Sequence, residues 1–262
     1  MTGAFVPGVS PPTVASPRAL VFRCRGSEVL VAGTGAEIPL EPAPSDPETH
    51  YLGALAGVDC FAAAAGDDEA VDGLELRHLR SLYGVLSDEH WALAGRAVQL
   101  VEWERTHRFC GVCGAPTEPF PGERARSCGA CDHLAFPRLS PAVIMLVRRG
   151  RELLLARGRR VTEPIYSCVA GFVDPGESLE EAVVREVREE VGIEIADVRY
   201  FGSQSWPFPH SLMIGFTASW AGGEITIEEE ELVDAGWFPP EALPELPAPL
   251  SIARRLIDSA LT

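Results

Sequence analysis

The chain has 262 residues, which leaves room for one large domain or two smaller ones. Hydrophobic residues make up 46% of the sequence and charged residues 23%, a composition typical of a globular protein with a sizeable core. The formal net charge of -16 argues against sequence-independent binding to nucleic acids or to anionic membranes.

The N-terminal segment, residues 1–18, lacks the basic start and apolar core of a signal peptide. No apolar run in the chain reaches the roughly 18 residues of a transmembrane helix. We therefore expect a cytoplasmic protein with no membrane partner. The proline-containing first 20 residues are interpreted as a loose arm.

Short apolar runs over residues 19–86, broken by glycine, proline and aspartate, predict a small β-rich domain, with residues 37–50 as a loop. Ser87 is a suitable N-cap for a helix, and apolar residues at helical spacing extend that helix to about Arg105. We therefore expect an N-terminal domain over residues 1–106 that ends in a helix.

Two Cys-x₂-Cys pairs follow, separated by fourteen residues: Cys110, Cys113, Cys128 and Cys131. This spacing is typical of a structural zinc site, in which four thiolates hold one tetrahedral ion and leave no coordination position open. The alternative is a set of unliganded thiols. We expect one structural Zn²⁺ per chain in a zinc ribbon over residues 107–137. Binding of nucleic acid by this ribbon stays open.

The remaining residues, 138–262, alternate between strand and helix patterns. Residues 178–192 form a strongly amphipathic helical pattern, with Ser178 as N-cap and Gly192 as C-cap, and residues 251–261 predict a closing helix. Strands are expected over residues 141–147, 152–157, 167–173, 197–206, 212–222 and 223–228, and at the end of 228–238.

Three glutamates of the amphipathic segment, Glu186, Glu189 and Glu190, lie at positions i, i+3 and i+4 and therefore share one helix face. Like charges at this spacing repel by a few tenths of a kcal/mol per pair. Either the face is simply solvated, or a strongly cationic group binds against it.

The run from Gly171 to Ile193 resembles the Nudix box. Its pattern is a glycine, five residues, a glutamate at Glu177, seven residues, and then Arg-Glu-apolar-x-Glu-Glu-x-Gly-apolar from Arg185, and every specified position matches. The resemblance implies an α/β protein whose catalytic domain, residues 138–262, is an α/β/α sandwich with a mixed sheet. It also implies metal-dependent cleavage of a nucleoside diphosphate that is linked to another group.

Under this resemblance, Glu186 and Glu190, one turn apart, are the first-choice ligands for Mg²⁺ or Mn²⁺, which prefer oxygen ligands. Glu189 and Glu177 are second choices that can hold a metal, its water or Arg185. We expect Arg185 to orient these carboxylates rather than to bind substrate. The identity of the general base and the choice between the two metals stay open.

The family also implies functional residues outside the helix. The backbone carbonyl of Ala170 and the carboxylate of Glu231 are further metal ligands. Phe136 and Phe172 are candidates for stacking on a base, with plain core packing as the alternative for each. Ala253 is expected to line the nucleotide site, and Arg80 is a weaker candidate contact.

The stretch SQSWPFPHS, from Ser203 to Ser211, is similar to the SQPWPFPxS signature of the NAD(H) pyrophosphatases, a Nudix family that also carries a four-cysteine zinc ribbon. One position departs from the pattern, because Ser205 stands where the signature has proline. The expected dinucleotide-binding residues are Gln204, Ser205, Trp206, Pro207, Phe208, Pro209, His210 and Ser211. For Trp206 and Phe208 the alternative is packing as core.

The resemblance implies hydrolysis of the pyrophosphate of NAD(H) to nicotinamide mononucleotide and AMP, together with removal of NAD caps from RNA 5′ ends. Another nucleoside diphosphate such as ADP-ribose is an alternative substrate, and a non-catalytic nucleotide- or RNA-binding module is an alternative class. Family members are usually homodimers. Between Arg124 and Arg160 there are nine arginines and two acidic residues, which predicts either a basic surface for RNA or a solvated hairpin.

Overall fold

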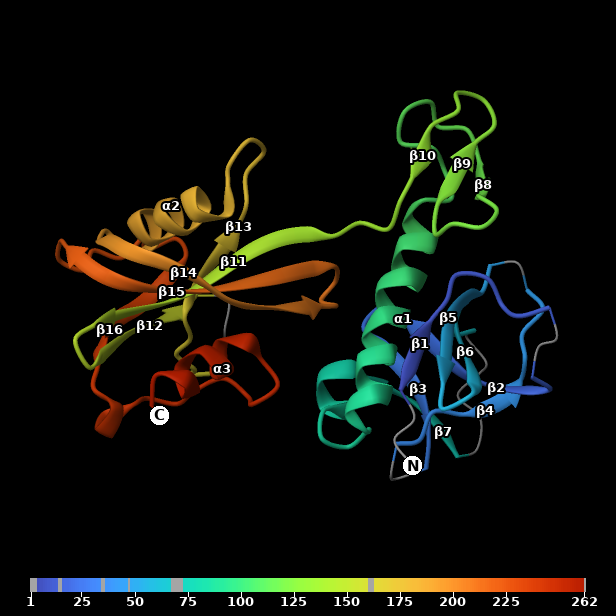
Figure 1. Ribbon diagram of the computed structural model, residues 1–262, viewed down its shortest axis with the longest axis horizontal. Coiled ribbons are helices and arrows are strands. Elements are labelled where there is room, and N and C mark those ends of the chain that lie inside the picture. The colour runs from blue at the N-terminus through green and yellow to red at the C-terminus, as the bar shows by residue number, and fades with distance from the viewer. Residues whose placement is uncertain are drawn as a thin grey trace. The chain divides into compact units, whose positions relative to one another are not determined.

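The computed structural model describes residues 4–13, 16–33, 36–46, 48–66, 73–159 and 163–261 (Figure 1). Contacts within the chain define two compact units: Met1–Arg138 with Pro207–His210, and Leu139–Trp206 with Ser211–Thr262. Over the described ranges, no helix is both long enough and apolar enough to cross a membrane.

The first unit contains a seven-stranded sheet with the order β1-β5-β6-β2-β3-β7, and β4 pairs with β2. Strands β2 and β6 are parallel, and the other neighbours are antiparallel. The bounds are β1 Phe5–Pro7, β2 Arg18–Arg25, β3 Glu28–Ala32, β4 Leu40–Pro42, β5 His50–Leu55, β6 Val58–Ala64 and β7 Leu74–His78.

Two of these strands correct the sequence-based expectation. Strand β1 falls within the expected loose arm, and β4 falls within the expected loop. Both end at a proline, and among the described strands each pairs with a single neighbour, β1 with β5 and β4 with β2. Proline is tolerated at such positions because no second neighbour needs its missing N–H, so the proline content hid two genuine strands.

Helix α1 (Asp88–Thr106) covers this sheet and confirms the expected helix. The Ser87 hydroxyl caps it by accepting a hydrogen bond from the backbone N–H of His90. Leu93 and Ala97 of the helix belong to the same buried core as Phe22 of the sheet. A short 3-10 helix, Leu79–Leu82, connects β7 to this region.

The zinc ribbon is a three-stranded antiparallel sheet formed by β8 (Thr117–Pro119), β9 (Arg126–Cys128) and β10 (Leu134–Ala135). A buried ion pair between Arg126 and Glu104 anchors the ribbon to the end of α1. Arg126 also donates a hydrogen bond to the hydroxyl of Thr117. Within the first unit, the ribbon is therefore joined to helix α1 by a buried network of paired polar groups.

The second unit is a six-stranded mixed sheet with the order β14-β15-β11-β12-β16, and β13 pairs with β11. Strands β11 and β15 are parallel, which makes the sheet mixed. The strands are β11 Ser140–Arg149, β12 Glu152–Gly158, β13 Val169–Phe172, β14 Glu194–Trp206, β15 Ser211–Gly222 and β16 Leu232–Phe238.

Helices α2 (Leu179–Val191) and α3 (Ile252–Ser259) cover opposite faces of this sheet (Figure 1). Alternate residues of β11 point to the two faces: Val143 and Met145 pack with α2, whereas Ile144 and Leu146 pack with α3. The α/β/α sandwich with a mixed sheet is therefore confirmed. A 3-10 turn, Pro240–Ala242, follows β16.

The expected strand over residues 223–228 is wrong. This segment has no strand partner, and its backbone instead contacts the C-terminal end of α2. The N–H of Thr226 donates to the carbonyl of Val191 at 3.0 Å, and the N–H of Glu228 donates to the carbonyl of Glu190 at 2.9 Å. The last carbonyls of a helix lack hydrogen-bond donors within the helix, and the backbone N–H groups of this segment serve as those donors.

Candidate active site

Helix α2 begins and ends at fixed residues, and this sets the direction in which its glutamates point. The Ser178 hydroxyl accepts from the N–H of Glu181, and the Glu181 carboxylate accepts from the N–H of Ser178, which completes a capping box. At the other end Gly192 adopts the left-handed conformation, with φ of 71°. The helix therefore turns Glu186 and Glu190 toward the sheet, where they are only 8% and 5% exposed.

The first glycine of the box makes room for one of these carboxylates. A Cβ atom added to Gly171 would lie 1.9 Å from the carboxyl carbon of Glu186. Gly171 is fixed in place because β13 pairs with β11, where it lies opposite Val143. Any larger residue at this position must displace Glu186, which gives a physical reason for the glycine that precedes the helix.

Glu190 is the most strongly perturbed acid of the site. Burial raises its pKa, and the charges of Glu186 and Glu231 add to this rise, while a hydrogen bond from the backbone N–H of Ala170 opposes it; the resulting pKa is about 8. Burial likewise raises the pKa of Glu186, while Arg185 opposes that shift. Carboxyl groups held together in this way repel one another unless a proton or a cation lies between them.

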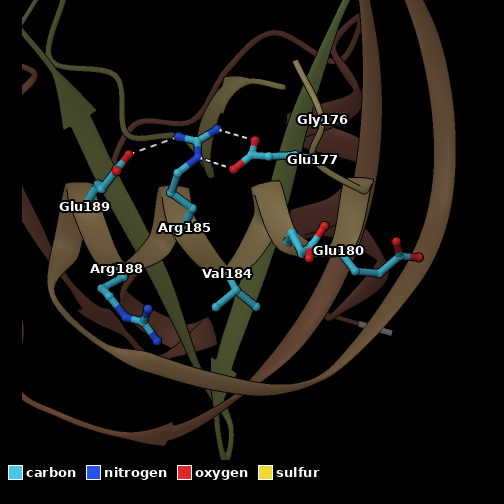
Figure 2. Close-up of a pocket in the computed structure, with 8 residues that line it drawn as sticks. Gly176, Glu177, Glu180, Val184, Arg185, Arg188 and Glu189 are labelled. Atoms are coloured by element: carbon cyan, nitrogen blue, oxygen red, sulfur yellow. Dashed lines mark hydrogen bonds and ion pairs between the residues drawn. The ribbon is translucent and has the colours of Figure 1, made fainter. Parts of the chain in front are cut away.

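Arg185 is occupied by the carboxylates around it, as Figure 2 shows. Its guanidinium makes a two-point contact with Glu177, at 2.6 and 2.9 Å, and contacts Glu189 at 2.9 Å and Glu186 at 2.8 Å. It also donates to the carbonyl of Phe172. The hydrogen bonds to Arg185 lower the pKa of Glu177 to about 2. This arrangement supports the interpretation that Arg185 orients carboxylates.

A cavity of about 580 Å³ lies beside Arg185, Glu186 and Glu190. It is bordered by β13, by α2, by the segment before β16 and by the start of β15. The predicted site residues on its wall are Ala170, Phe172, Arg185, Glu186, Glu190, Ser211 and Glu231. The fold thus brings together four segments that are far apart in the sequence, and Phe172 presents a ring that is 59% exposed.

Some lining residues carried no signal in the sequence. Cys168 and Met213 line the same cavity, although neither belongs to a recognisable motif. Met213 is placed there because β15 runs parallel to β11, and Cys168 because it directly precedes β13. Such long-range pairings cannot be deduced from local spacing.

The carboxylate cluster fits a divalent cation of the oxygen-preferring kind. Glu186 and Glu190 are buried, mutually repelling acids beside Glu231, and a cation would relieve the burial of their charge. Over the described ranges, only the four cysteines of the ribbon already have their ligand atoms within 4.8 Å of one another. The acidic site therefore offers ligands but not a closed coordination shell.

The ribbon cysteines have the geometry of a zinc site. The Sγ atoms of Cys110 and Cys131 are 3.6 Å apart, and those of Cys113 and Cys128 are 3.5 Å apart. The N–H of Val112 points to the Sγ of Cys110 at 3.4 Å, as expected for a thiolate that needs neutralising contacts. Four sulfur ligands at these separations fit a tetrahedral Zn²⁺ ion.

The signature stretch divides between two environments. Ser205 and Trp206 are the last residues of β14, opposite Leu212 and Ser211 of β15. The side chain of Gln204 faces the start of α3, where it is hydrogen-bonded at both ends.

Pro207, Phe208, Pro209 and His210 group with the first unit. Within that unit the ring of Phe208 stacks on His78 with centroids 5.7 Å apart, and the guanidinium of Arg80 lies 4.5 Å from the Phe208 centroid. Phe136 also belongs to the first unit and is 55% exposed.

Ala253 lies on the buried face of α3 and is not part of the cavity wall. The backbone carbonyl of Ala253 instead accepts a hydrogen bond from the Sγ of Cys168, with the two atoms 3.9 Å apart. Cys168 does line the cavity. Ala253 therefore lies one layer behind the site.

Several of the arginines that could form a basic surface are hydrogen-bonded within the protein. Arg124 donates to the backbone carbonyls of Gly8 and Tyr51, and Arg126 pairs with the buried carboxylate of Glu104. Arg160 lies outside the described residues. The arginines of this region that donate hydrogen bonds within the protein are Arg124, Arg126, Arg149, Arg151 and Arg159.

Comparison with known proteins identifies the class that this fold and site define. Residues 138–259 match the model of the NUDIX domain, and residues 105–136 match that of the NADH pyrophosphatase zinc ribbon domain. Residues 16–103, for which the sequence suggested no family, match the NADH pyrophosphatase-like rudimentary NUDIX domain. A NUDIX hydrolase structure from Nitrosomonas europaea is 19% identical, with a TM-score of 0.46 over 52% of this chain and 80% of that chain.

Two bacterial relatives are much more similar in sequence. The NAD-capped RNA hydrolase NudC of Deinococcus radiodurans is 45% identical over 94% of this chain and 89% of its own length. That of Pseudomonas fluorescens is 48% identical over 80% of this chain and 76% of its own. The chain belongs to the NudC family of zinc-ribbon Nudix proteins.

Proposed function

We propose that the chain hydrolyses the pyrophosphate bond of NAD(H), giving nicotinamide mononucleotide and AMP, and that it removes NAD caps from RNA 5′ ends. The observation that carries the proposal is the group of Glu186, Glu190 and Glu231 around the cavity, with the backbone of Ala170 and Gly171 directly beside Glu190 and Glu186. The names of the relatives and the complete Nudix box support the same reaction.

Glu186, Glu190, Glu231 and the carbonyl of Ala170 are the groups that would hold Mg²⁺ or Mn²⁺. When bound, such ions neutralise pyrophosphate oxygens and activate a water for attack on phosphorus. The burial of Glu186 and Glu190 keeps water away from their charges and so strengthens their attraction for a cation.

The protein side chains have separate tasks in this reaction. Arg185 holds Glu177, Glu186 and Glu189 in fixed directions through hydrogen bonds of 2.6–2.9 Å. The exposed ring of Phe172, on the wall of the cavity, is placed to stack on a base, a contact worth roughly 1–3 kcal/mol.

Several finer statements form part of the proposal. The domains are residues 1–106, 107–137 and 138–262, and the structural metal is one Zn²⁺ per chain. The protein acts in the cytoplasm as a homodimer, in which Phe136 of one protomer reaches the active site of its partner. The signature residues from Gln204 to Ser211 take part in dinucleotide selection, by contact with the substrate or by holding the structure around it.

Product analysis tests the proposal directly. The purified protein is incubated with NADH, NAD⁺, ADP-ribose or NAD-capped RNA, with Mg²⁺ or Mn²⁺ in turn, and products are separated by chromatography. We expect metal-dependent release of AMP from NAD(H) and of a 5′-monophosphate RNA from capped RNA. Cleavage of ADP-ribose but not of NADH would overturn the proposed substrate, and no cleavage of any compound would overturn the proposed reaction.

A further inference from the structure

Both polar atoms of the Gln204 side chain are hydrogen-bonded to the segment that leads into α3. Its Nε2 group donates to the carbonyl of Leu250 at 2.9 Å, and its Oε1 atom accepts from the N–H of Ile252 at 2.7 Å. Donor and acceptor ends of the amide thus each meet the matching backbone group. The two contacts join β14 to residues 46 and 48 positions further along the chain.

A second feature seats the same end of α3 on the sheet. Ile252 is buried, and a Cβ atom added to Gly215 of β15 would lie 2.9 Å from its Cδ1 atom. The glycine therefore leaves the space into which Ile252 packs. Together, the Gln204 amide and the space above Gly215 fix the position and the direction of the first turn of α3 on the sheet.

The start of α3 in turn supports the wall of the candidate active site. Ala253 directly follows Ile252, whose N–H is bound by Gln204. The backbone carbonyl of Ala253 accepts a hydrogen bond from the thiol of Cys168. Cys168 lines the cavity together with Ala170 and Glu190. Cys168, which directly precedes the strand that carries Ala170 and Gly171, thus packs in the same buried core as Ile252 and Ala253 of α3.

We propose that Gln204 is a positioning residue, which holds the start of α3 and through it the cavity wall, and that it does not read the substrate with its amide. Turning this amide away from the start of α3 toward a ligand would break both hydrogen bonds. The effect on catalysis rests on the proposed pyrophosphatase function, whereas the effect on α3 does not.

Hydrogen exchange without substrate tests the structural half. In Gln204→Ala, the amides of residues 250–257 should exchange at least about fivefold faster than in the wild-type protein, because two hydrogen bonds at the start of the helix are lost. Gln204→Glu keeps the acceptor for the Ile252 N–H and loses the donor to Leu250, so its exchange should be intermediate. Arg199→Gln, on an exposed position of the same strand, is the matched control and should leave exchange unchanged.

Kinetics with NADH tests the catalytic half. Gln204→Ala should lower kcat at least about tenfold, because misplaced catalytic groups slow the chemical step rather than only weakening binding. Ser251→Ala removes the N-cap of α3, whose hydroxyl accepts from the N–H of Arg254, without touching β14. It should lower kcat in the same direction by about threefold, and the double variant should lose less than the product of the two single losses.

Three results would overturn the proposal. One is unchanged exchange of residues 250–257 in Gln204→Ala. Another is faster exchange with normal kcat, which would remove the link to the site. The third is a raised KM with unaltered kcat, which is the signature of direct substrate contact. If the wild-type protein cleaves no NADH, the proposed function fails, while the exchange data still decide whether Gln204 holds α3.

Discussion

The buried carboxyl of Glu190 makes Glu190→Gln the most informative single substitution. Burial, with Glu186 and Glu231, raises the pKa of Glu190 from 4.5 to about 8. Between these values the folded chain keeps a proton that the unfolded chain has released, so stability falls as the pH rises through this window. At pH 7 the penalty for the metal-free protein is about 3 kcal/mol.

Glutamine keeps the shape of the side chain and cannot ionise. We therefore expect metal-free Glu190→Gln to be more stable than the wild type by up to about 3 kcal/mol at pH 7, and by almost nothing below pH 4.5. Native-state hydrogen exchange of the α2 amides at several pH values, in buffer without Mg²⁺ or Mn²⁺, measures this difference. The same variant should lose at least about a hundredfold in kcat when metal is supplied, because one ligand carries no charge.

Glu229→Gln is the control, because Glu229 lies in the neighbouring acidic run and its side chain does not line the cavity. It should keep both the wild-type pH dependence and the wild-type turnover. The reasoning would be refuted if Glu190→Gln showed the same stability profile as the wild type between pH 5 and 8. Turnover within tenfold of the wild type would remove Glu190 from the metal site.

Four further outcomes are expected. Gly171→Ala should lower kcat at least about tenfold with little change in Tm, because the flexible Glu186 carboxylate yields to the new Cβ; an active enzyme would contradict this. Phe172→Ala should raise KM for NADH about tenfold, as measured by steady-state kinetics, and an unchanged KM would exclude stacking. Cys113→Ser should reduce bound zinc well below one per chain by elemental analysis and lower the stability of the first unit by more than about 3 kcal/mol. Ser178→Ala should destabilise α2 by about 1 kcal/mol in hydrogen exchange, and full protection would show that the capping box contributes nothing.

Local patterns predicted the elements whose stability is encoded over a few neighbouring residues. Helix α2 was predicted from its apolar period and from its caps, Ser178 and Gly192, and the structure places both caps as expected. The cysteine spacing predicted a four-sulfur cluster in the same way. The acidic face of α2 was equally visible, since positions i, i+3 and i+4 share a helix face whatever the rest of the chain does.

Only the tertiary structure determined the hydrogen-bond and packing partners of the individual side chains. Nothing local shows that Gly171 lies against the Glu186 carboxyl, that the Gln204 amide holds the start of α3, or that Phe208 stacks on His78. The apolar alternation of residues 223–228 predicted a strand, yet their N–H groups meet the end of α2 instead. A side chain's period and charge are set by its neighbours in sequence, whereas its partners are set by strand pairings and helix packing between distant segments, which only the folded chain fixes.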